Sequence, residues 1–205
     1  MQMKKLLFFL ILCSFLLPPS AYGADLPVLK NGWYRVYIED VGSIDLPPTM
    51  EVLSKVPQFI AVQQGLNKSG DTVVYTGIAI VTDIGSYGDY QKLNFNIHEY
   101  NKSEIEELNT LYKQYIQSEL TKPGMGQIKI IEWHPLKLET INGMSCIHVS
   151  TKQRFNDGLL GFVHVYFFGN NDRMHRLFFS IFPGSDYWKA DFADILNSFS
   201  ITNVR

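Results

Sequence analysis

The sequence predicts an α+β fold, in which an antiparallel β-sheet has helices packed on its faces. Runs of aromatic and β-branched residues recur along the chain, separated by short turns that contain Gly, Asn or Asp. Two segments, at 103–122 and 188–196, instead carry apolar residues at helical spacing. The 14 Phe, 11 Tyr and 3 Trp residues provide enough apolar surface for a sizeable core.

The first half of the chain contains five segments with the composition of strands. They are Trp33–Ile38, Ser43–Leu46, Phe59–Gln64, Thr72–Thr82 and Leu93–His98. Pro47 and Pro48 end the second segment, because a proline cannot donate to a strand ladder. Residues 67–71 have the composition of a hairpin turn between the third and fourth segments.

A helix is expected from Ser103 to about Lys122. Ser103 and Glu106 have the spacing of a capping box, in which a hydroxyl and a carboxylate bond the free amides of the first turn. Pro123 disfavours helical geometry in the residue before it, which ends the helix there. The apolar residues at helical spacing are Ile105, Leu108, Leu111, Tyr115, Ile116 and Leu120.

The second half is predicted to be a series of hairpins, starting with extended segments at 128–133 and 136–141. Asn142-Gly143 suits a two-residue type I′ turn, because both residues accept positive φ. The expected pairs are Leu138 with Ile147 and Leu136 with Val149 on an apolar face, and Lys137 with His148 and Glu139 with Cys146 on the other face.

The next two turns determine which side chains share a face. At Asn156-Asp157-Gly158 the apolar pattern favours a three-residue loop, with Gly158 left-handed. It pairs Thr151 with Val163, Val149 with Val165, Ile147 with Phe167, His148 with Tyr166 and Ser150 with His164. A five-residue loop at Gly169–Arg173 would put Leu177, Phe179 and Ile181 on the Val165 face, and Arg176 opposite Tyr166.

A closing helix with Ser185 or Asp186 as its cap is expected to pack on the Val149/Val165 face, and residues after 196 form a last short strand or cap. Its apolar stripe consists of Trp188, Phe192, Ile195, Leu196 and Phe199.

The first 23 residues predict a Sec-type signal peptide. Lys4 and Lys5 precede an apolar run at 6–17, and Ala21 and Gly23 place small residues before a cut at Ala24. One alternative is a membrane anchor, although the run is shorter than the roughly 20 residues of a spanning helix. The other is a lipoprotein attached at Cys13, although Leu12 stands where lipoprotein processing requires a small residue.

The expected mature chain, 24–205, is one domain without a membrane span. Loss of Lys4 and Lys5 changes the formal charge from −2 to −4, so no nucleic-acid partner is expected. Cys146 is then the single cysteine, which excludes an internal disulfide and favours a small, inert strand residue over a nucleophile.

Three stretches together resemble a known family. They are SIDLPPTMEV at 43–52, ETINGMSCIHVST at 139–151 and WKADFADILNSFSI at 188–201. In this order they resemble the PsbP-like α/β/α sandwich domains. This group includes the Mog-type nuclear-transport proteins and the bacterial exported DcrB-type proteins, and this chain resembles the DcrB-type proteins most. The resemblance spans about 33–202 and implies helices on both faces of an antiparallel sheet and a non-enzymatic accessory role. None of the three stretches is catalytic, and no residue role is carried over.

The candidate ligand-binding residues are His148, His164, Tyr166 and Arg176. The expected registers place them on the polar sheet face, together with Cys146, Lys137 and Glu139. Such a face could bind a small ligand or a transition metal. The competing interpretation is an ordinary outer face, covered in part by Phe162, Phe168 and Phe178.

No nucleophile motif and no recognised metal spacing occurs among these residues, so we expect no enzyme, no metal and no cofactor. Two hypotheses remain open. The first is an exported, non-catalytic accessory or binding domain of the bacterial cell envelope, periplasmic or extracellular, with an unknown envelope protein as partner. The second is a small-molecule or metal-binding protein that uses the His148/His164/Tyr166/Arg176 face. The loop Tyr87–Tyr90 is a further candidate contact surface, because Tyr offers a large area at low entropic cost.

Overall fold

The computed structural model describes residues 28–55, 58–66, 68–122, 128–155, 158–185 and 189–205. The elements are β1 (Tyr34–Ile38), β2 (Gly42–Leu46), β3 (Glu51–Ser54), β4 (Phe59–Leu66), β5 (Thr72–Ile84), the 3-10 helix η1 (Ile97–Glu99), α2 (Lys102–Leu120), β6 (Lys129–Ile141), β7 (Met144–Arg154), β8 (Leu160–Asn170), β9 (Arg173–Ile181), α3 (Lys189–Ser198) and β10 (Ser200–Ile201). Within these ranges, no helix is both long and apolar enough to cross a membrane. The proposed signal peptide and the expected cap Asp186 lie outside the described residues.

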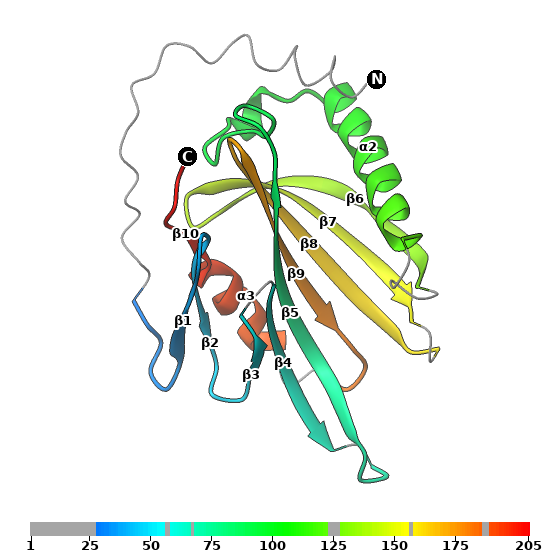
Figure 1. Ribbon diagram of the computed structural model, residues 1–205. Coiled ribbons are helices and arrows are strands. Elements are labelled where there is room, and N and C mark those ends of the chain that lie inside the picture. The colour runs from blue at the N-terminus through cyan, green and yellow to red at the C-terminus, as the bar shows by residue number, and fades with distance from the viewer. Residues whose placement is uncertain (1–27, 56–57, 67, 123–127, 156–157, 186–188) are drawn as a thin grey trace.

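The strands form two antiparallel sheets (Figure 1). The large sheet has the order β3-β4-β5-β9-β8-β7-β6, and the small sheet has the order β1-β2-β10. Figure 1 shows α2 on the side of β6, and α3 near β1, β2 and β3. Helices therefore pack on both faces of an antiparallel sheet, which confirms the predicted α+β class.

Each face of the large sheet has its own core. The α2-side core consists of Ile116, Leu136, Ile147, Val149, Val163, Val165 and Phe167, with Ile105, Leu108, Tyr112 and Tyr115 packed against it. The α3-side core includes Cys146, Tyr166, Phe168, Leu177, Phe179, Ile195, Leu196 and Phe199, together with Val36, Ile44 and Leu46 from the small sheet. Two separate apolar layers explain why long parts of β7 and β8 are buried on both sides, whereas buried and half-buried residues alternate along β9.

The first two predicted hairpin registers are confirmed. Asn142 and Gly143 have φ of 47° and 76°, and Gly158 has φ of 82°. Leu138 lies opposite Ile147, and Val149 lies opposite Val165. The turn residues set both registers because their positive φ is sterically cheap only for Gly and Asn.

One expected pair in the first hairpin is absent. β6 is a single strand with a register shift between His134 and Lys137, so Leu136 does not pair with Val149 as expected. Leu136 is still buried in the α2-side core with Val149. The bulge adds a residue to β6 without changing the core face.

The predicted register of the third hairpin is wrong. Asn170 pairs with Arg173, so the turn contains two residues rather than five, with Asn171 at φ 64°. Leu177 consequently lies opposite Tyr166, and Leu177 and Phe179 belong to the α3-side core. A register change of one residue moves every side chain of a strand to the other face.

Gly169 misled the sequence prediction, because it lies in β8 and not in the turn. A Cβ atom at Gly169 would clash with the backbone of Gln91, whose carbonyl oxygen lies 2.4 Å from that position. Gly169 is therefore required by a close backbone approach, which is the second common reason for glycine in a strand.

The closing helix packs on the face opposite to the expected one. The Val149/Val165 face is covered by α2, whereas Ile195, Leu196 and Phe199 pack in the α3-side core. The corrected β9 register explains this arrangement, because it turns Leu177 and Phe179 toward α3. Trp188 lies outside the described residues.

The start of α2 differs from the prediction by two residues. Asn101, not Ser103, is the cap: its side-chain oxygen accepts from the N–H of Glu104 at 3.1 Å, and the Glu104 carboxylate accepts from the N–H of Asn101 at 2.8 Å. Asn is at least as good a cap as Ser, so composition alone could not choose between the two boxes.

The segment 93–98 is not a strand but a turn followed by η1. Leu93 is buried in the α3-side core, and its carbonyl oxygen accepts from the N–H of Ser145 at 2.6 Å. Ser145 Oγ donates to the carbonyl oxygen of Phe95, also at 2.6 Å. These contacts with the start of β7 replace a strand ladder. The short edge strand β3 was not predicted.

Candidate functional site

Glu139, His148 and His164 form a hydrogen-bonded row across three neighbouring strands, which we call the histidine row. The strands β6, β7 and β8 contribute one residue each. The expected pairs of Lys137 with His148 and of His148 with Tyr166 are present. The two Gly-containing turns therefore bring His148, His164 and Tyr166 together as predicted.

The row is connected by two hydrogen bonds. His148 Nδ1 lies 3.2 Å from Glu139 Oε1, and His148 Nε2 lies 3.0 Å from His164 Nδ1. An ionised carboxylate only accepts, so His148 Nδ1 carries the hydrogen on that side. In a neutral row His148 Nε2 then accepts from His164 Nδ1, which leaves His164 Nε2 as an acceptor at the outer end.

Aromatic rings pack against both histidines of the row. Tyr166 stacks on His148 at 4.2 Å between ring centroids and an interplanar angle of 12°. Phe192 of α3 lies 5.3 Å from the His164 ring and 4.4 Å from that of Phe179. His148 is 8% exposed and Tyr166 only 2%, whereas His164 is half-buried. A ligand could therefore reach the row at His164 but not at His148.

Burial is the main electrostatic influence on the outer histidine. It lowers the pKa of His164 to about 4, with smaller electrostatic contributions from the neighbouring His148 and His134 side chains. The pKa of Glu139 is also lowered, because its carboxylate accepts the hydrogen bond from His148. At neutral pH the outer end of the row is thus a neutral imidazole.

The other chemical candidates on this face are inert. Cys146 is fully buried, and burial raises the pKa of its thiol to about 12, so the thiolate that a nucleophile needs is not formed at neutral pH. Among the described residues, no group of three or more His, Cys, Asp or Glu side chains is arranged to hold a metal ion.

Arg176 does not join the histidine row, contrary to the prediction. It lies opposite Phe167, on the α2 face. Its guanidinium donates to Asp83 Oδ1 at 2.7 Å, lies 3.7 Å from Glu119 Oε2 and sits over the Tyr115 ring at 5.9 Å. Arg176 therefore ties α2 to the sheet, and the two-residue turn at 171–172 is the reason for its change of face.

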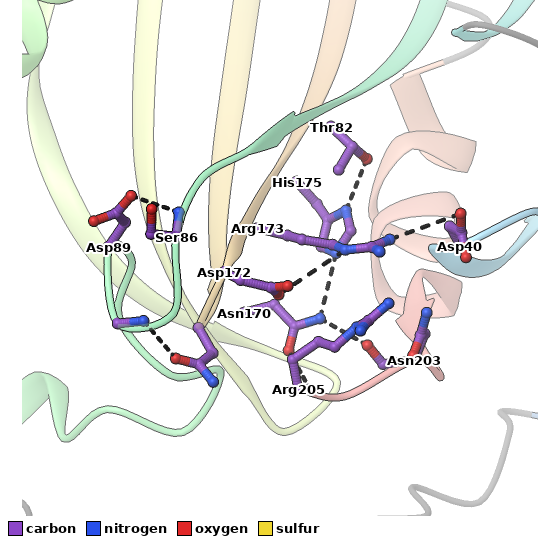
Figure 2. Close-up of polar contacts among 12 residues, drawn as sticks. Asp40, Thr82, Ser86, Asp89, Asn170, Asp172, Arg173, His175, Asn203 and Arg205 are labelled. Carbon is purple, nitrogen blue, oxygen red and sulfur yellow. Dashed lines mark hydrogen bonds and ion pairs between the residues drawn. The ribbon is translucent and has the colours of Figure 1, made fainter.

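A second polar cluster, not found from the sequence, surrounds the β8–β9 turn (Figure 2). Asn170 Nδ2 donates to the carbonyl oxygen of Asn203 at 2.8 Å, and its Oδ1 accepts from the N–H of Arg205 at 2.8 Å. We call Asn170, His175 and the tail residues 203–205 the C-terminal clasp. His175 Nδ1 lies 2.9 Å from Thr82 Oγ1, and its Nε2 lies 3.5 Å from Asn170 Nδ2.

The clasp is structural. His175 and Asn170 are 0% and 1% exposed, and burial, followed by the Arg173 charge, lowers the pKa of His175 to about 4. The 85–90 loop joins the same turn, because the N–H groups of Gly88 and Tyr90 donate to Asn171. The single sequence feature that could have indicated this cluster is the pair of polar residues beside Asn171, Asn170 and Asp172. Tyr87 of the candidate contact loop is 85% exposed.

A groove of about 450 Å³ separates the two sheets at their edges. It lies between β1, the edge of the small sheet, and β3, the edge of the large sheet. It is lined by Tyr34, Arg35, Val36, Tyr37, Met50, Glu51, Val52 and Lys55. Tyr34 Oη donates to the carbonyl oxygen of Met50 at 2.5 Å and so links the two walls. Sequence patterns could not find this groove, because β3 was not predicted.

No protein-family model and no curated protein matches the chain. Among solved structures, it is similar to the cyanobacterial PsbP protein (CyanoP) of Synechocystis sp. PCC 6803, with 10% identity, a TM-score of 0.42 and coverage of 91% of this chain and 98% of that chain. It is also similar to a protein of Bacteroides thetaiotaomicron, with 12% identity, a TM-score of 0.42 and coverage of 78% of this chain. This chain spans 44% of that protein's length. We transfer no function and no residue role from either structure; the first is a PsbP protein, and neither description mentions a Mog-type or DcrB-type protein.

Proposed function

We propose that the chain is an exported, non-catalytic binding domain that serves as an accessory to a protein partner in the bacterial cell envelope. The observation that carries the proposal is the groove between β1 and β3, because a concave surface bordered by two sheet edges is suited to binding. Export rests on the basic, apolar and small-residue pattern of residues 1–23.

The chemistry of the polar groups favours binding over catalysis. Both ring nitrogens of His148 are occupied by Glu139 and His164, which leaves neither to take a proton from a substrate. The thiol of Cys146 is buried and protonated. The histidine row in this interpretation stabilises the β6–β7–β8 sheet.

The test is crosslinking in the native envelope. A photocrosslinking residue replaces the 66% exposed Tyr37 in the groove, and a second variant carries it at the 85% exposed Tyr87. A discrete partner crosslinked from either position, with cleavage before Ala24 shown by N-terminal sequencing, supports the proposal. Recovery of the chain only as a free monomer, or with its first 23 residues retained, contradicts it.

A second candidate function is the binding of a small ligand at His164. The half-buried imidazole presents Nε2 as an acceptor, and Phe162, which is 43% exposed, lies two residues before it on the same strand, β8. A metal would need further ligands from outside the described residues. Native mass spectrometry and metal analysis of protein purified without a His tag test this function. If neither ligand nor metal is retained, and His164→Ala leaves thermal shifts with candidate ligands unchanged, this function is wrong.

A further inference from the structure

The outer edge of β1 is positioned to accept another strand. β2 lies between β1 and β10, so β1 has a strand neighbour on one side only among the described strands. The groove is lined by four consecutive β1 residues, Tyr34 to Tyr37. Side chains of a strand alternate between its faces, so consecutive lining residues mean that the backbone edge itself forms the wall.

The hydrogen-bonding direction of the β1 edge follows from its partner strand. The N–H of Asp45 donates to Ser198 Oγ at 2.9 Å, and therefore points away from β1. Asp45 faces Arg35, and two residues further along Ser43 faces both Tyr37 and Ser200 of β10. In an antiparallel ladder, residues of such a non-hydrogen-bonded pair direct their N–H and C=O groups away from the partner strand, and this holds for both strands. The N–H and C=O of Tyr37 therefore point away from β2.

The charges of the groove fit a neutral occupant. Arg35 is bonded to the buried Asp45 at 2.6 Å, so its charge is compensated within the small sheet. Glu51 and Lys55, both exposed, contribute opposite charges on the β3 side. The apolar lining comes from the partly buried Val52 and from the edges of Val36 and Met50, each of which is 5% exposed and belongs to the α3-side core. A groove without net charge, with a backbone row as its wall, matches a peptide backbone better than an ionic ligand.

We propose that the groove binds an extended peptide segment of the partner protein, which adds to β1 as a fourth strand of the small sheet and places alternate apolar side chains against Val52 and the exposed edges of the core residues Val36 and Met50. This inference rests on the proposed function and specifies the class of partner, which is a protein that presents an extended peptide segment. Backbone hydrogen bonds to Tyr37 supply affinity, and the apolar lining supplies selectivity.

The experiment selects peptides and then removes single backbone hydrogen bonds. A phage-displayed library of random linear dodecapeptides is panned on the mature chain, and the enriched peptides are synthesised. Tyr37→Pro deletes the outward N–H but no β1–β2 ladder bond, because proline is tolerated at the open side of an edge strand. Tyr37→Ala is the matched control, since it keeps the N–H. We expect Tyr37→Pro to raise the Kd about tenfold or more, and Tyr37→Ala to change it by about threefold at most.

A scan of the peptide keeps the test independent of whether Tyr37→Pro folds. Single N-methyl groups along the peptide should abolish binding to the wild-type chain at alternate positions only, because every second amide faces β1. Equal affinities of the proline and alanine variants, if both fold, or N-methyl effects without alternation, overturn the inference. The inference is also overturned if panning enriches no peptide. It is overturned as well if the wild-type chain sediments as a dimer that Tyr37→Pro dissociates, because the groove would then bind a second copy of the chain.

Failure of this inference can be told apart from failure of the proposed function. A partner crosslinked from Tyr87, together with peptides that show no alternation, keeps the binding function and rejects strand addition. Alternating peptide binding without any crosslinked envelope partner rejects the proposed envelope role but keeps the groove as a peptide site.

Discussion

Individual side chains show how burial changes chemistry in this protein. His164 and His175 both lie in environments that hold the imidazole neutral, one at the outer end of the histidine row and the other in the C-terminal clasp. Their hydrogen-bond partners, His148 and Thr82, accommodate a neutral ring. Five histidines in a sequence look alike, but their neighbours decide which of them resist protonation.

The lowered pKa values predict a loss of stability in acid. The unfolded chain binds protons on both histidines below about pH 6.5, whereas the folded chain does so only near pH 4. The stability that neutral histidines provide is thus complete above pH 6.5 and is lost as the pH falls toward 4, by about 1–3 kcal/mol per histidine. Urea unfolding between pH 7 and pH 4.5 measures this.

His164→Gln should flatten this pH profile by removing one of the two contributions. His98→Gln is the control. His98 is exposed in the folded chain, so folding changes its surroundings little and its replacement should leave the pH profile almost unchanged. The lowered pKa of Glu139 adds a loss of the same sign at lower pH. A His164→Gln profile identical to that of the wild type would contradict the assignment of His164 as a neutral, buried imidazole.

Helices and strands in this chain begin and turn where side chains satisfy backbone groups. The cap of α2 is formed by Asn101 and Glu104. Gly169 allows the segment around Gln91 to lie against β8, and the N–H of Asn171 donates to the Gln91 carbonyl at 3.4 Å. The cap fixes where α2 begins, and the Gln91 contacts hold the long connection between β5 and α2 against the end of the large sheet.

The position of the α2 cap can be tested by a pair of substitutions. Asn101→Ala removes the acceptor for the Glu104 N–H and should cost about 1 kcal/mol of unfolding free energy. Ser103→Ala, at the cap position favoured by the sequence, should change it by less than about 0.5 kcal/mol. Chemical denaturation compares the two; the reverse order would place the helix start at Ser103.

Gly169→Ala should destabilise the fold by about 1–3 kcal/mol, because the new Cβ would meet the backbone of Gln91. Gly77→Ala in β5 is the matched control. Its Cβ would meet only Ser180 Cβ at 3.9 Å, an ordinary contact, so little loss is expected. Thermal unfolding of both variants decides, and equal melting temperatures would show that Gln91 does not approach β8 this closely.

The molecule as a whole is a large sheet covered on one face by α2 and on the other by α3 and a small sheet. The chain end completes the second layer: β10 pairs with β2, and the tail bonds to Asn170. Because β2 lies in the middle of the small sheet, its two neighbours come from opposite ends of the described chain.

Removal of residues 203–205 should therefore destabilise the whole fold rather than loosen only the tail. It leaves the buried amide of Asn170 without its two backbone partners, at a cost of about 1–3 kcal/mol. The double variant, truncated and Asn170→Ala, should lose less than the sum of the single changes, because both remove the same interaction. Additive losses in urea unfolding would contradict a role for the clasp.

The sequence correctly predicted the antiparallel α+β class, two hairpin registers and the proximity of His148, His164 and Tyr166. The registers and the histidine proximity depend on a turn and on the alternation beside it, which lie within a few residues of one another, and the fold class depends on equally local strand and helix periodicity. Asn142-Gly143 and Gly158 contain the required backbone freedom in the residue types themselves.

Contacts between distant segments settled the rest. Gly169 faces Gln91, so it is a strand residue, and the one-residue difference in the β9 register moves Arg176 to the α2 face and Phe179 to the α3 face. The groove depends on β1 and the segment around β3 meeting in space. Local sequence patterns do not predict such long-range contacts, because the free energy that stabilises them comes from apolar layers that exist only once the chain has folded.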